Sequence, residues 1–273
     1  MRPINSRFNL SVFIFLSGAT LLTGNSCSNS GQSERYRQLH RDATHWNTIG
    51  YKARDPHLQS TWNRPYYTIQ GTLCYTDNLL DAALSDVGFF RIQDKNSGSI
   101  MFTRSGNFKF NASHQIVTDD GYILIDFPHN SLENLNVWPG WHSFQLPVYA
   151  ADDDAQVRPL SATTYSIDKV HAINAQYNQI NGGLLELSTT DLAATLARML
   201  IIARVMALDN RRYYGFLPVL ESQYQSSLQI NSDCRCYFHL NPNKLPEACV
   251  ESRRLADLID RLLPSVAPAM DKN

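Results

Sequence analysis

Residues 88–125 of the 273-residue chain read GFFRIQDKNSGSIMFTRSGNFKFNASHQIVTDDGYILI, and their pattern indicates the fold more clearly than any other segment. Short apolar runs at residues 88–92, 100–103 and 107–110 alternate with turns made of Asp, Asn, Ser and Gly. Another run, 122–125, follows the turn Asp119-Asp120-Gly121. Runs of this length, divided by such turn residues, are typical of antiparallel hairpins. The stretch therefore predicts a β-meander.

Helical patterns lie on both sides of the meander. Residues 34–46 are polar, lack Pro and Gly, and predict a short helix that ends before Gly50. In residues 191–214 the apolar side chains recur at spacings of three and four, the period of a helix with one apolar face. Further helices are expected at 219–228 and 252–263. We therefore expect an α+β fold, with a mostly antiparallel β domain flanked by N- and C-terminal helices.

The helix predicted at 191–214 is the candidate assembly helix. Thr189 or Thr190 is a candidate N-cap. The apolar stripe contains Leu192, Leu196, Met199, Leu200 and Met206. A helix as short as residues 34–46 cannot cover this stripe along its whole length. We expect the uncovered Leu and Met side chains to dock on a partner, each gaining ~1.5–3 kcal/mol on burial.

The first residues have the three-part form of a secretory signal. Arg2 and Arg7 precede an apolar run, and small residues then lead to Cys27. The run, residues 8–22, is about 15 residues long, shorter than the ~20 that a spanning helix needs. We expect a signal peptide at 1–26 and a polar tether at 27–33, with the mature protein in the periplasm. Cys27 is the lipidation candidate, and a retained membrane anchor is the alternative to a cleaved signal.

Three cysteines, Cys234, Cys236 and Cys249, lie in the last segment, together with His239. Export to an oxidising compartment favours a disulfide that joins Cys249 to Cys234 or Cys236. Zinc binding is the alternative, although the spacing matches no standard zinc module. Cys74 lies in an alternating apolar stretch and is expected to be a small buried residue.

The composition and the missing motifs exclude several classes of function. Lys and Arg number 24 against 25 Asp and Glu, a net charge of -1, which argues against a nucleic-acid binder. Hydrophobic residues make up 43% of the chain, enough for a packed core. The sequence has no Gly-x-Ser-x-Gly, phosphate-binding loop or His-Glu-x-x-His pattern. We expect neither an enzyme nor a cofactor, metal site or small-molecule substrate.

Several ordered motifs carry a resemblance to one family. They are NTIGYKA at 47–53, GTLCYTDNLLDAAL at 71–84, FTRSGNF at 102–108, QIVTDDGY at 115–122 and LELSTTDL at 185–192. In this order they are similar to the motifs of the bacterial flagellar rod and hook family, most of all its distal-rod type. The resemblance covers most of residues 34–230.

The resemblance implies a structural role in the flagellar basal body. Subunits of this family pair their terminal helices and pack them with neighbours into a tube, while the β domain forms the outer wall. The implied partners are other rod and hook proteins. The turn Thr103-Arg104-Ser105-Gly106 is expected to be a hairpin with Arg104 on its rim, without a catalytic role.

The chain also departs from the family pattern. It has a secretion signal in place of the first half of the N-terminal helix, and a cysteine-bearing tail. We expect a helix remnant and linker at 34–65, a β domain at 66–181, a C-terminal helix at 182–230 and the tail at 231–273. Two functions stay open: a structural rod or hook subunit that contributes to motility, or an exported, lipid-anchored accessory protein that docks on the rod without polymerising.

Overall fold

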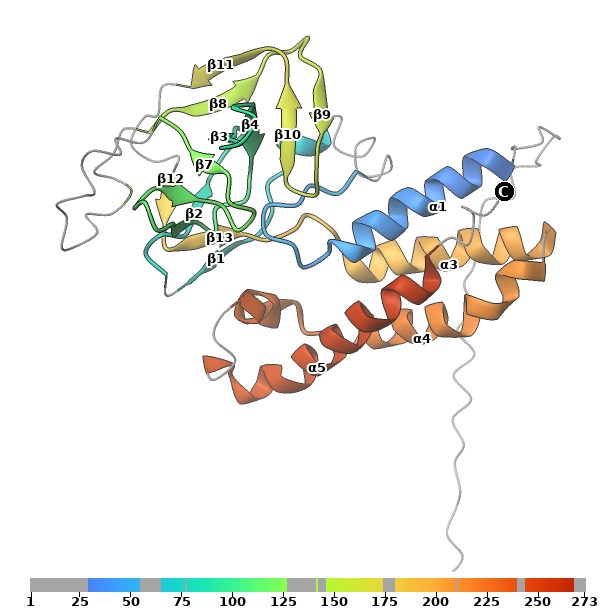
Figure 1. Cartoon of the computed structure of the whole chain (residues 1–273). Coiled ribbons are helices and arrows are strands. Elements are labelled where there is room, and N and C mark those ends of the chain that lie inside the picture. Colours follow the sequence, from blue (N-terminus) through green and yellow to red (C-terminus); the bar gives the residue numbers. More distant parts are fainter. Residues whose placement is uncertain are drawn as a thin grey trace, which may run out of the picture.

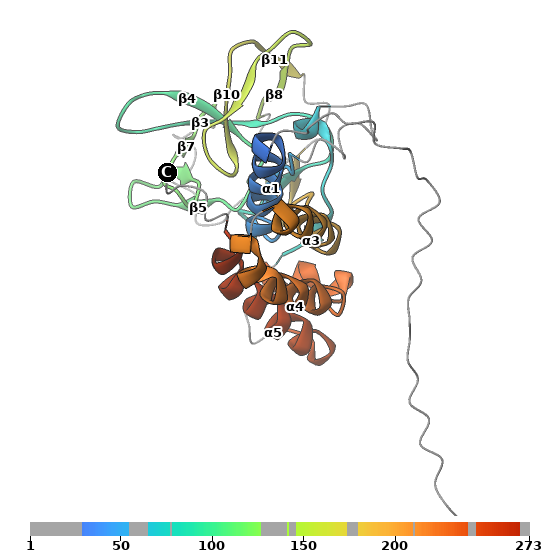
Figure 2. The same ribbon diagram turned by 90° about the vertical axis from the view of Figure 1, so that its right-hand side faces the viewer.

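The computed structural model describes residues 29–54, 65–76, 78–126, 141, 146–173, 180–209, 211–239 and 244–267. The predicted signal peptide and Cys27 lie outside these residues. The strands gather in one half of the molecule and the four long helices in the other, as Figure 1 shows. In Figure 2 most strands lie above the helices α3, α4 and α5, and α1 lies between them at about the height of β5. The α+β fold predicted from the sequence is confirmed.

The β region is made of short strands. They are β1 (Leu73–Tyr75), β2 (Ala82–Leu84), β3 (Phe90–Gln93), β4 (Ile100–Thr103), β5 (Lys109–Phe110), β6 (Ile116–Val117), β7 (Ile123–Leu124), β8 (Val148–Ala151), β9 (Val157–Pro159), β10 (Thr164–Ile167), β11 (Val170–Ile173), β12 (Ile180–Gly182) and β13 (Leu184–Glu186), with a short 3-10 helix η1 (Tyr66–Thr68) before them. All the described pairings are antiparallel.

The largest sheet has the strand order β5-β6-β7-β3-β4-β10-β9, and three two-stranded sheets, β1-β13, β11-β8 and β12-β2, surround it. The predicted meander supplies its first five strands, so the hairpins expected from residues 88–125 are present. Strand β3 alternates buried and half-buried residues, with Phe90 and Ile92 facing inward. This is the period-two pattern of a strand with one face on a core. Phe108 and Trp141 fill that core from the opposite side.

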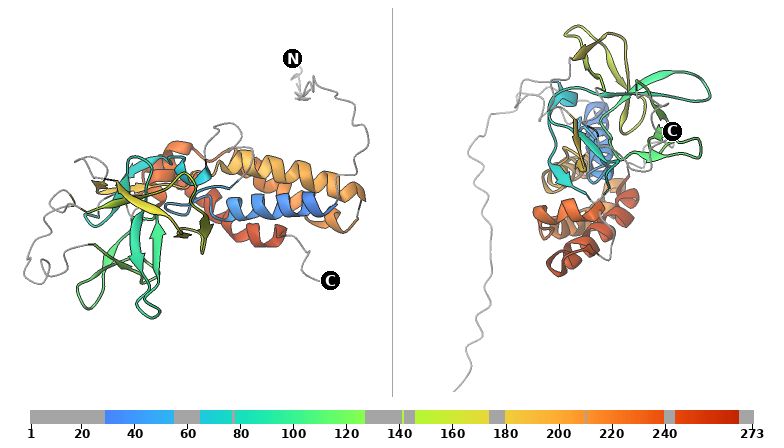
Figure 3. Two further views of the ribbon diagram at one scale, coloured as in Figure 1. Left: turned by 90° about the horizontal axis from the view of Figure 1, so that it is seen from above. Right: turned by 90° about the vertical axis from the view of Figure 1, so that its left-hand side faces the viewer.

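The helical half consists of α1 (Asn29–Thr44), α3 (Leu192–Asp209), α4 (Leu217–Ser227) and α5 (Glu247–Leu262), with the 3-10 helices η4 (Arg211–Phe216), η5 (Ser232–His239) and η7 (Leu263–Val266). Figure 3 shows α1 and α3 side by side along the length of this half. Within the described residues, no helix combines the length and the apolar character that crossing a membrane requires.

The N-cap of α3 differs from the prediction. The side chain of Asp191 caps the helix, because its Oδ1 accepts a hydrogen bond from the N–H of Ala194 at 3.0 Å. Thr189 is used elsewhere: its hydroxyl oxygen accepts a bond from the N–H of Ala53 at 2.8 Å. Thr189 therefore joins the chain that leaves α1 to the chain that enters α3.

The apolar stripe of α3 is covered by the protein itself, so the expectation that it is left open is wrong. Its members Leu192, Leu196, Met199, Leu200 and Met206 are all buried, and they share one core with side chains of α1, α4, η5 and α5. The physical reason is the C-terminal tail, which folds back as α4 and α5 and adds the apolar surface that α1 alone lacks. The predicted docking surface is therefore part of an internal core.

Candidate functional site: a buried ion network between the two halves

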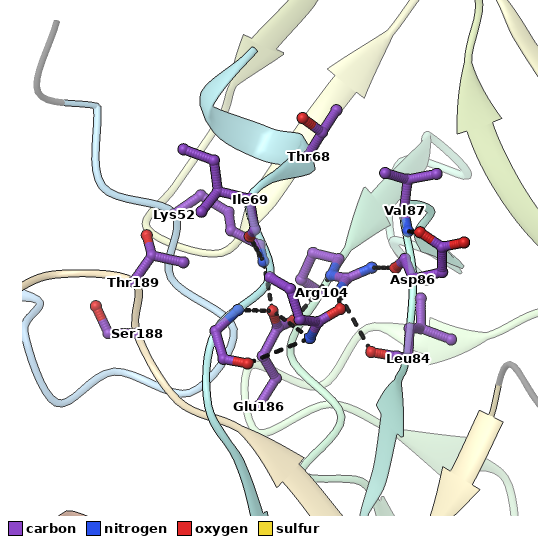
Figure 4. A network of polar contacts seen from close by, with 12 residues as sticks. Lys52, Thr68, Ile69, Leu84, Asp86, Val87, Arg104, Glu186, Ser188 and Thr189 are labelled. Atoms are coloured by element: carbon purple, nitrogen blue, oxygen red, sulfur yellow. Dashed lines mark hydrogen bonds and ion pairs between the residues drawn. The ribbon is translucent and has the colours of Figure 1, made fainter. Parts of the chain in front are cut away.

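Three segments far apart in the sequence meet where the β region joins the helices. Lys52 comes from the chain that leaves α1, Arg104 follows strand β4, and Glu186 ends strand β13. Glu186 accepts a hydrogen bond from Lys52 Nζ at 2.5 Å on Oε1, and one from Arg104 Nε at 2.9 Å on Oε2. Figure 4 shows the three side chains converging. Each of them is at most 2% exposed.

Neighbouring groups satisfy the remaining polar atoms of the network. Glu186 Oε1 also accepts bonds from the side chain of Gln70 and from the N–H of Gly71. Lys52 Nζ donates to the carbonyl of Ile69 at 2.6 Å. The guanidinium of Arg104 donates to three backbone carbonyls, those of residues 84, 86 and 88, and to Gln70 Oε1. Buried charges persist only when they are paired and hydrogen-bonded in this way.

The charges in the network are unequal, with two cations around one carboxylate. Burial, joined by the charge of Arg104, lowers the pKa of Lys52 to about 8. Burial alone would raise the pKa of Glu186, but the two cations and their hydrogen bonds outweigh it and hold that pKa below its usual range. Glu186 is therefore ionised at neutral pH, and both cations depend on it.

The network joins three of the motifs that carried the family resemblance. Lys52 belongs to the motif at 47–53, Arg104 to the one at 102–108, and Glu186 to the one at 185–192. The prediction that Arg104 lies on a hairpin rim is wrong. Its side chain turns inward because the carboxylate of Glu186 and three backbone carbonyls face it from the core.

Two glycines of these motifs allow the close approach. Gly50 has a φ of +70°, and a Cβ there would lie 2.5 Å from the backbone nitrogen of Ser105. A Cβ on Gly106 would lie 1.6 Å from the carbonyl oxygen of Ala82. Larger residues at either position would push apart the backbones that hold Lys52 and Arg104.

Two disulfides hold the tail, and one of them ties it to this junction. Cys234 is bonded to Cys249, which joins η5 to α5. Cys236 is bonded to Cys74, which joins η5 to strand β1 across a sequence separation of 162. Cys74 is buried, as expected, but its bond to Cys236 was not anticipated from the sequence. The signal that could have indicated it is the even number of cysteines after Cys27 in a chain that the sequence predicts to be exported.

Hydrogen bonds from the tail also fix α1. Tyr36 donates to the carbonyl of Val266 at 2.9 Å, and Trp46 donates to the carboxylate of Asp260 at 2.7 Å. Arg235 donates to the carbonyl of Trp46 at 2.7 Å and lies over its ring. The helices α1, α3, α4 and α5 thus form one bundle, and the ion network and the Cys74–Cys236 bond attach that bundle to the β region.

The fold and the junction together define a class: an α+β protein whose β domain and helical bundle are joined by a buried ion network and a disulfide. The hydrogen bonds of Lys52, Arg104 and Glu186 go to one another, to Gln70 and to backbone groups of the surrounding segments. Among the described residues, no three His, Cys, Asp or Glu side chains converge in a way that could hold a metal ion.

Part of the β region is similar to a known family. Residues 83–170 match the family described as the flagellar hook protein FlgE/F/G D1 domain. Over these residues the chain is similar to that domain, and the resemblance to the flagellar rod and hook family predicted from the sequence is confirmed for this segment. Strands β3 to β10, with the Arg104 turn between β4 and β5, lie within the matched range.

Individual relatives match the same kind of segment. The flagellar basal-body rod protein FlgG of Buchnera aphidicola subsp. Schizaphis graminum is 39% identical over 71 residues, 25% of this chain and 26% of that protein. FlgG of Caulobacter vibrioides is 42% identical over 69 residues, 24% of this chain and 26% of that protein. The flagellar hook protein FlgE of Escherichia coli K12 is 40% identical over 58 residues, 21% of this chain and 14% of that protein. The matches thus span about a quarter of the length of the FlgG relatives.

Proposed function

We propose that the protein is a structural component of the bacterial flagellar basal body that contributes to motility, and that it docks on the rod or hook without polymerising. The D1 match and the named rod and hook relatives support the basal body as its place of action. The buried network of Lys52, Arg104 and Glu186 supports a rigid building element over an enzyme. Other rod or hook proteins are the partners that this role requires.

One observation favours an accessory protein over a polymerising subunit. The apolar stripe of α3, including Leu196 and Met199, is completely buried against the chain's own α1, α4 and α5. A helix whose apolar face is already filled cannot offer that face to the next subunit of a tube. The disulfides Cys74–Cys236 and Cys234–Cys249 oppose the release of the tail.

The predicted export signal sets the proposed location. Cleavage before Cys27 would leave the mature protein in the periplasm, and lipidation of Cys27 would anchor it to a membrane close to the basal body. The two disulfides agree with an oxidising compartment.

Purification of basal bodies from the native host tests this function. A tagged chain expressed at its normal level should copurify with basal bodies, and it should be lost from that fraction in a strain that lacks the rod. The purified mature protein should be a monomer in light scattering and form no tubes in electron micrographs. Absence from basal bodies in the wild-type strain would refute the flagellar role, whereas tubes formed by the protein alone would refute the accessory role and favour a rod subunit.

A further inference from the structure

The outer face of α3 is apolar although its inner face is already filled. Ile201 is 62% exposed, Leu208 is 80% exposed, and Val205 between them is 40% exposed. Spacings of four and three place these side chains along one stripe of the helix, away from the bundle core. Tyr214 in η4, which follows α3, is 51% exposed and continues the apolar surface. We call these four residues the outer stripe.

The outer stripe ends at the end of the bundle where α1 begins. Helices α1 and α3 run antiparallel, because Thr189 before α3 bonds to Ala53 after α1, while Tyr36 near the start of α1 contacts Phe216 after α3. Figures 1 and 3 show this end of the pair on the side away from the strands. Helix α1 begins at Asn29, only two positions after Cys27.

The same helices are basic in a chain that is otherwise balanced. Together α1 and α3 contain five arginines against three acidic residues, while the whole chain has a net charge of -1. On α3, Arg198 and Arg204 are each three positions from Ile201 and therefore flank the outer stripe on its two sides. Arg204 is paired with Glu221 and is still 57% exposed. Long arginine side chains beside an apolar stripe are suited to the boundary between acyl chains and phosphate headgroups.

We propose that the outer stripe, with the arginines of α1 and α3, binds an anionic phospholipid surface and lays the helical bundle against the membrane to which Cys27 is attached. The proposal rests on the export and lipidation of Cys27 put forward above. A second copy of the chain fits less well, because three aliphatic side chains and one tyrosine fall short of the ~800 Å² per partner that a specific interface buries. A short apolar stripe in a basic surface is the form that adds to a lipid anchor.

The surface supplies the second of two attachments. A single acyl chain binds a membrane only marginally, and stable anchoring commonly adds a basic patch that attracts anionic headgroups. Helix α1 starts at the end of the bundle where the outer stripe ends, and its first residue is two positions after Cys27, so an anchor at Cys27 and the outer stripe can reach the membrane together. The β domain, at the opposite end of the bundle, then lies outside the membrane contact and can face the axial structure.

Vesicle cosedimentation tests the proposal without an acyl chain and without flagellar proteins. The mature chain with Cys27→Ser, disulfides intact, is mixed with vesicles of phosphatidylethanolamine and phosphatidylglycerol in equal parts, and with vesicles of phosphatidylcholine alone. We expect binding to the first, binding to the second that is at least about tenfold weaker, and loss of binding as salt screens the charges.

The double variant Ile201→Asp/Leu208→Asp tests whether the outer stripe makes the contact. The control is Leu160→Asp, at an exposed position of the β region. The double variant should bind the anionic vesicles at least about tenfold more weakly, the control should bind like the parent chain, and both should keep the parent's circular dichroism. Equal binding by all three chains, or no binding by the parent, overturns the proposal.

Two further outcomes would identify another occupant and also overturn it. A dimer in light scattering that Leu208→Asp disperses would assign the outer stripe to a second copy. Loss of basal-body association by the double variant, with unchanged vesicle binding, would assign the stripe to a protein partner. Copurification with basal bodies is measured separately, so failure of lipid binding and failure of the flagellar role are distinguishable.

Discussion

Substitution Glu186→Gln tests the junction most directly. Glu186 accepts hydrogen bonds from Lys52, Arg104, the side chain of Gln70 and the N–H of Gly71. Glutamine keeps the shape of the side chain, but it removes the negative charge and turns one acceptor into a donor. Lys52 and Arg104 would then be two buried cations facing each other without their shared anion.

The expected loss of unfolding free energy depends on which charge is left without a partner. Removing one partner of a buried ion pair costs ~3–5 kcal/mol of unfolding free energy. Lys52→Met breaks the same pair but leaves Glu186 matched one to one with Arg104, and it orphans the carbonyl of Ile69, a loss of ~1–3 kcal/mol. Glu186→Gln should therefore destabilise the protein more than Lys52→Met does, although both remove the same contact.

The pH dependence of the variant provides a second signature. The pKa of Lys52 is already lowered to about 8, and loss of Glu186 would lower it further. The unfolded chain then binds more protons than the folded one below the ordinary lysine pKa of ~10.4, so the stability of Glu186→Gln should rise with pH above neutrality. Lys52→Met should show no such rise.

Urea unfolding measured by tryptophan fluorescence can follow both halves, since Trp46 lies in the bundle and Trp141 in the β core. Asp154→Asn is the control, because it breaks the exposed pair with Lys169 and should change stability by less than ~1 kcal/mol. If Glu186→Gln costs no more than Lys52→Met, or no more than the control, the network does not hold the two halves together as argued.

Three other predictions concern separate features. Burial and two nearby arginines lower the pKa of His239 to about 4, below the ~6.5 of the unfolded chain. The free energy of unfolding that depends on neutral His239 is therefore complete above pH ~6.5 and falls by up to about 3 kcal/mol toward pH 4. The melting temperature of His239→Gln should depend less on pH than that of the parent chain. Cys74→Ser/Cys236→Ser opens a loop of sequence separation 162 and should cost up to about 5 kcal/mol in urea unfolding, an effect that vanishes if the parent chain is fully reduced. Gly50→Ala should lower stability by about 1–3 kcal/mol more than Gly98→Ala, because both have positive φ but only the first meets neighbouring backbone; equal losses in thermal melts would contradict the steric argument.

The local helices and hairpins can be predicted from the sequence alone. The hairpins of residues 88–125 follow from apolar runs divided by turn residues, and α3 follows from spacings of three and four, because both patterns arise from backbone geometry within a few residues. The resemblance to the flagellar rod and hook family could also be recognised from the sequence, since two of the motifs that carry it, at 102–108 and 115–122, lie in this part of the chain. The helix at 219–228 was placed within two residues of α4, because its apolar period is local as well.

Which apolar surfaces are buried, and which distant residues contact each other, became known only from the tertiary structure. Periodicity shows that α3 has an apolar face but not that α4 and α5 cover it, and it gives no reason to notice the exposed Ile201 and Leu208. The inward turn of Arg104 and the bond between Cys74 and Cys236 depend on partners 82 and 162 positions away. Such pairings are set by how separate elements pack, and no short-range spacing in a chain encodes that packing.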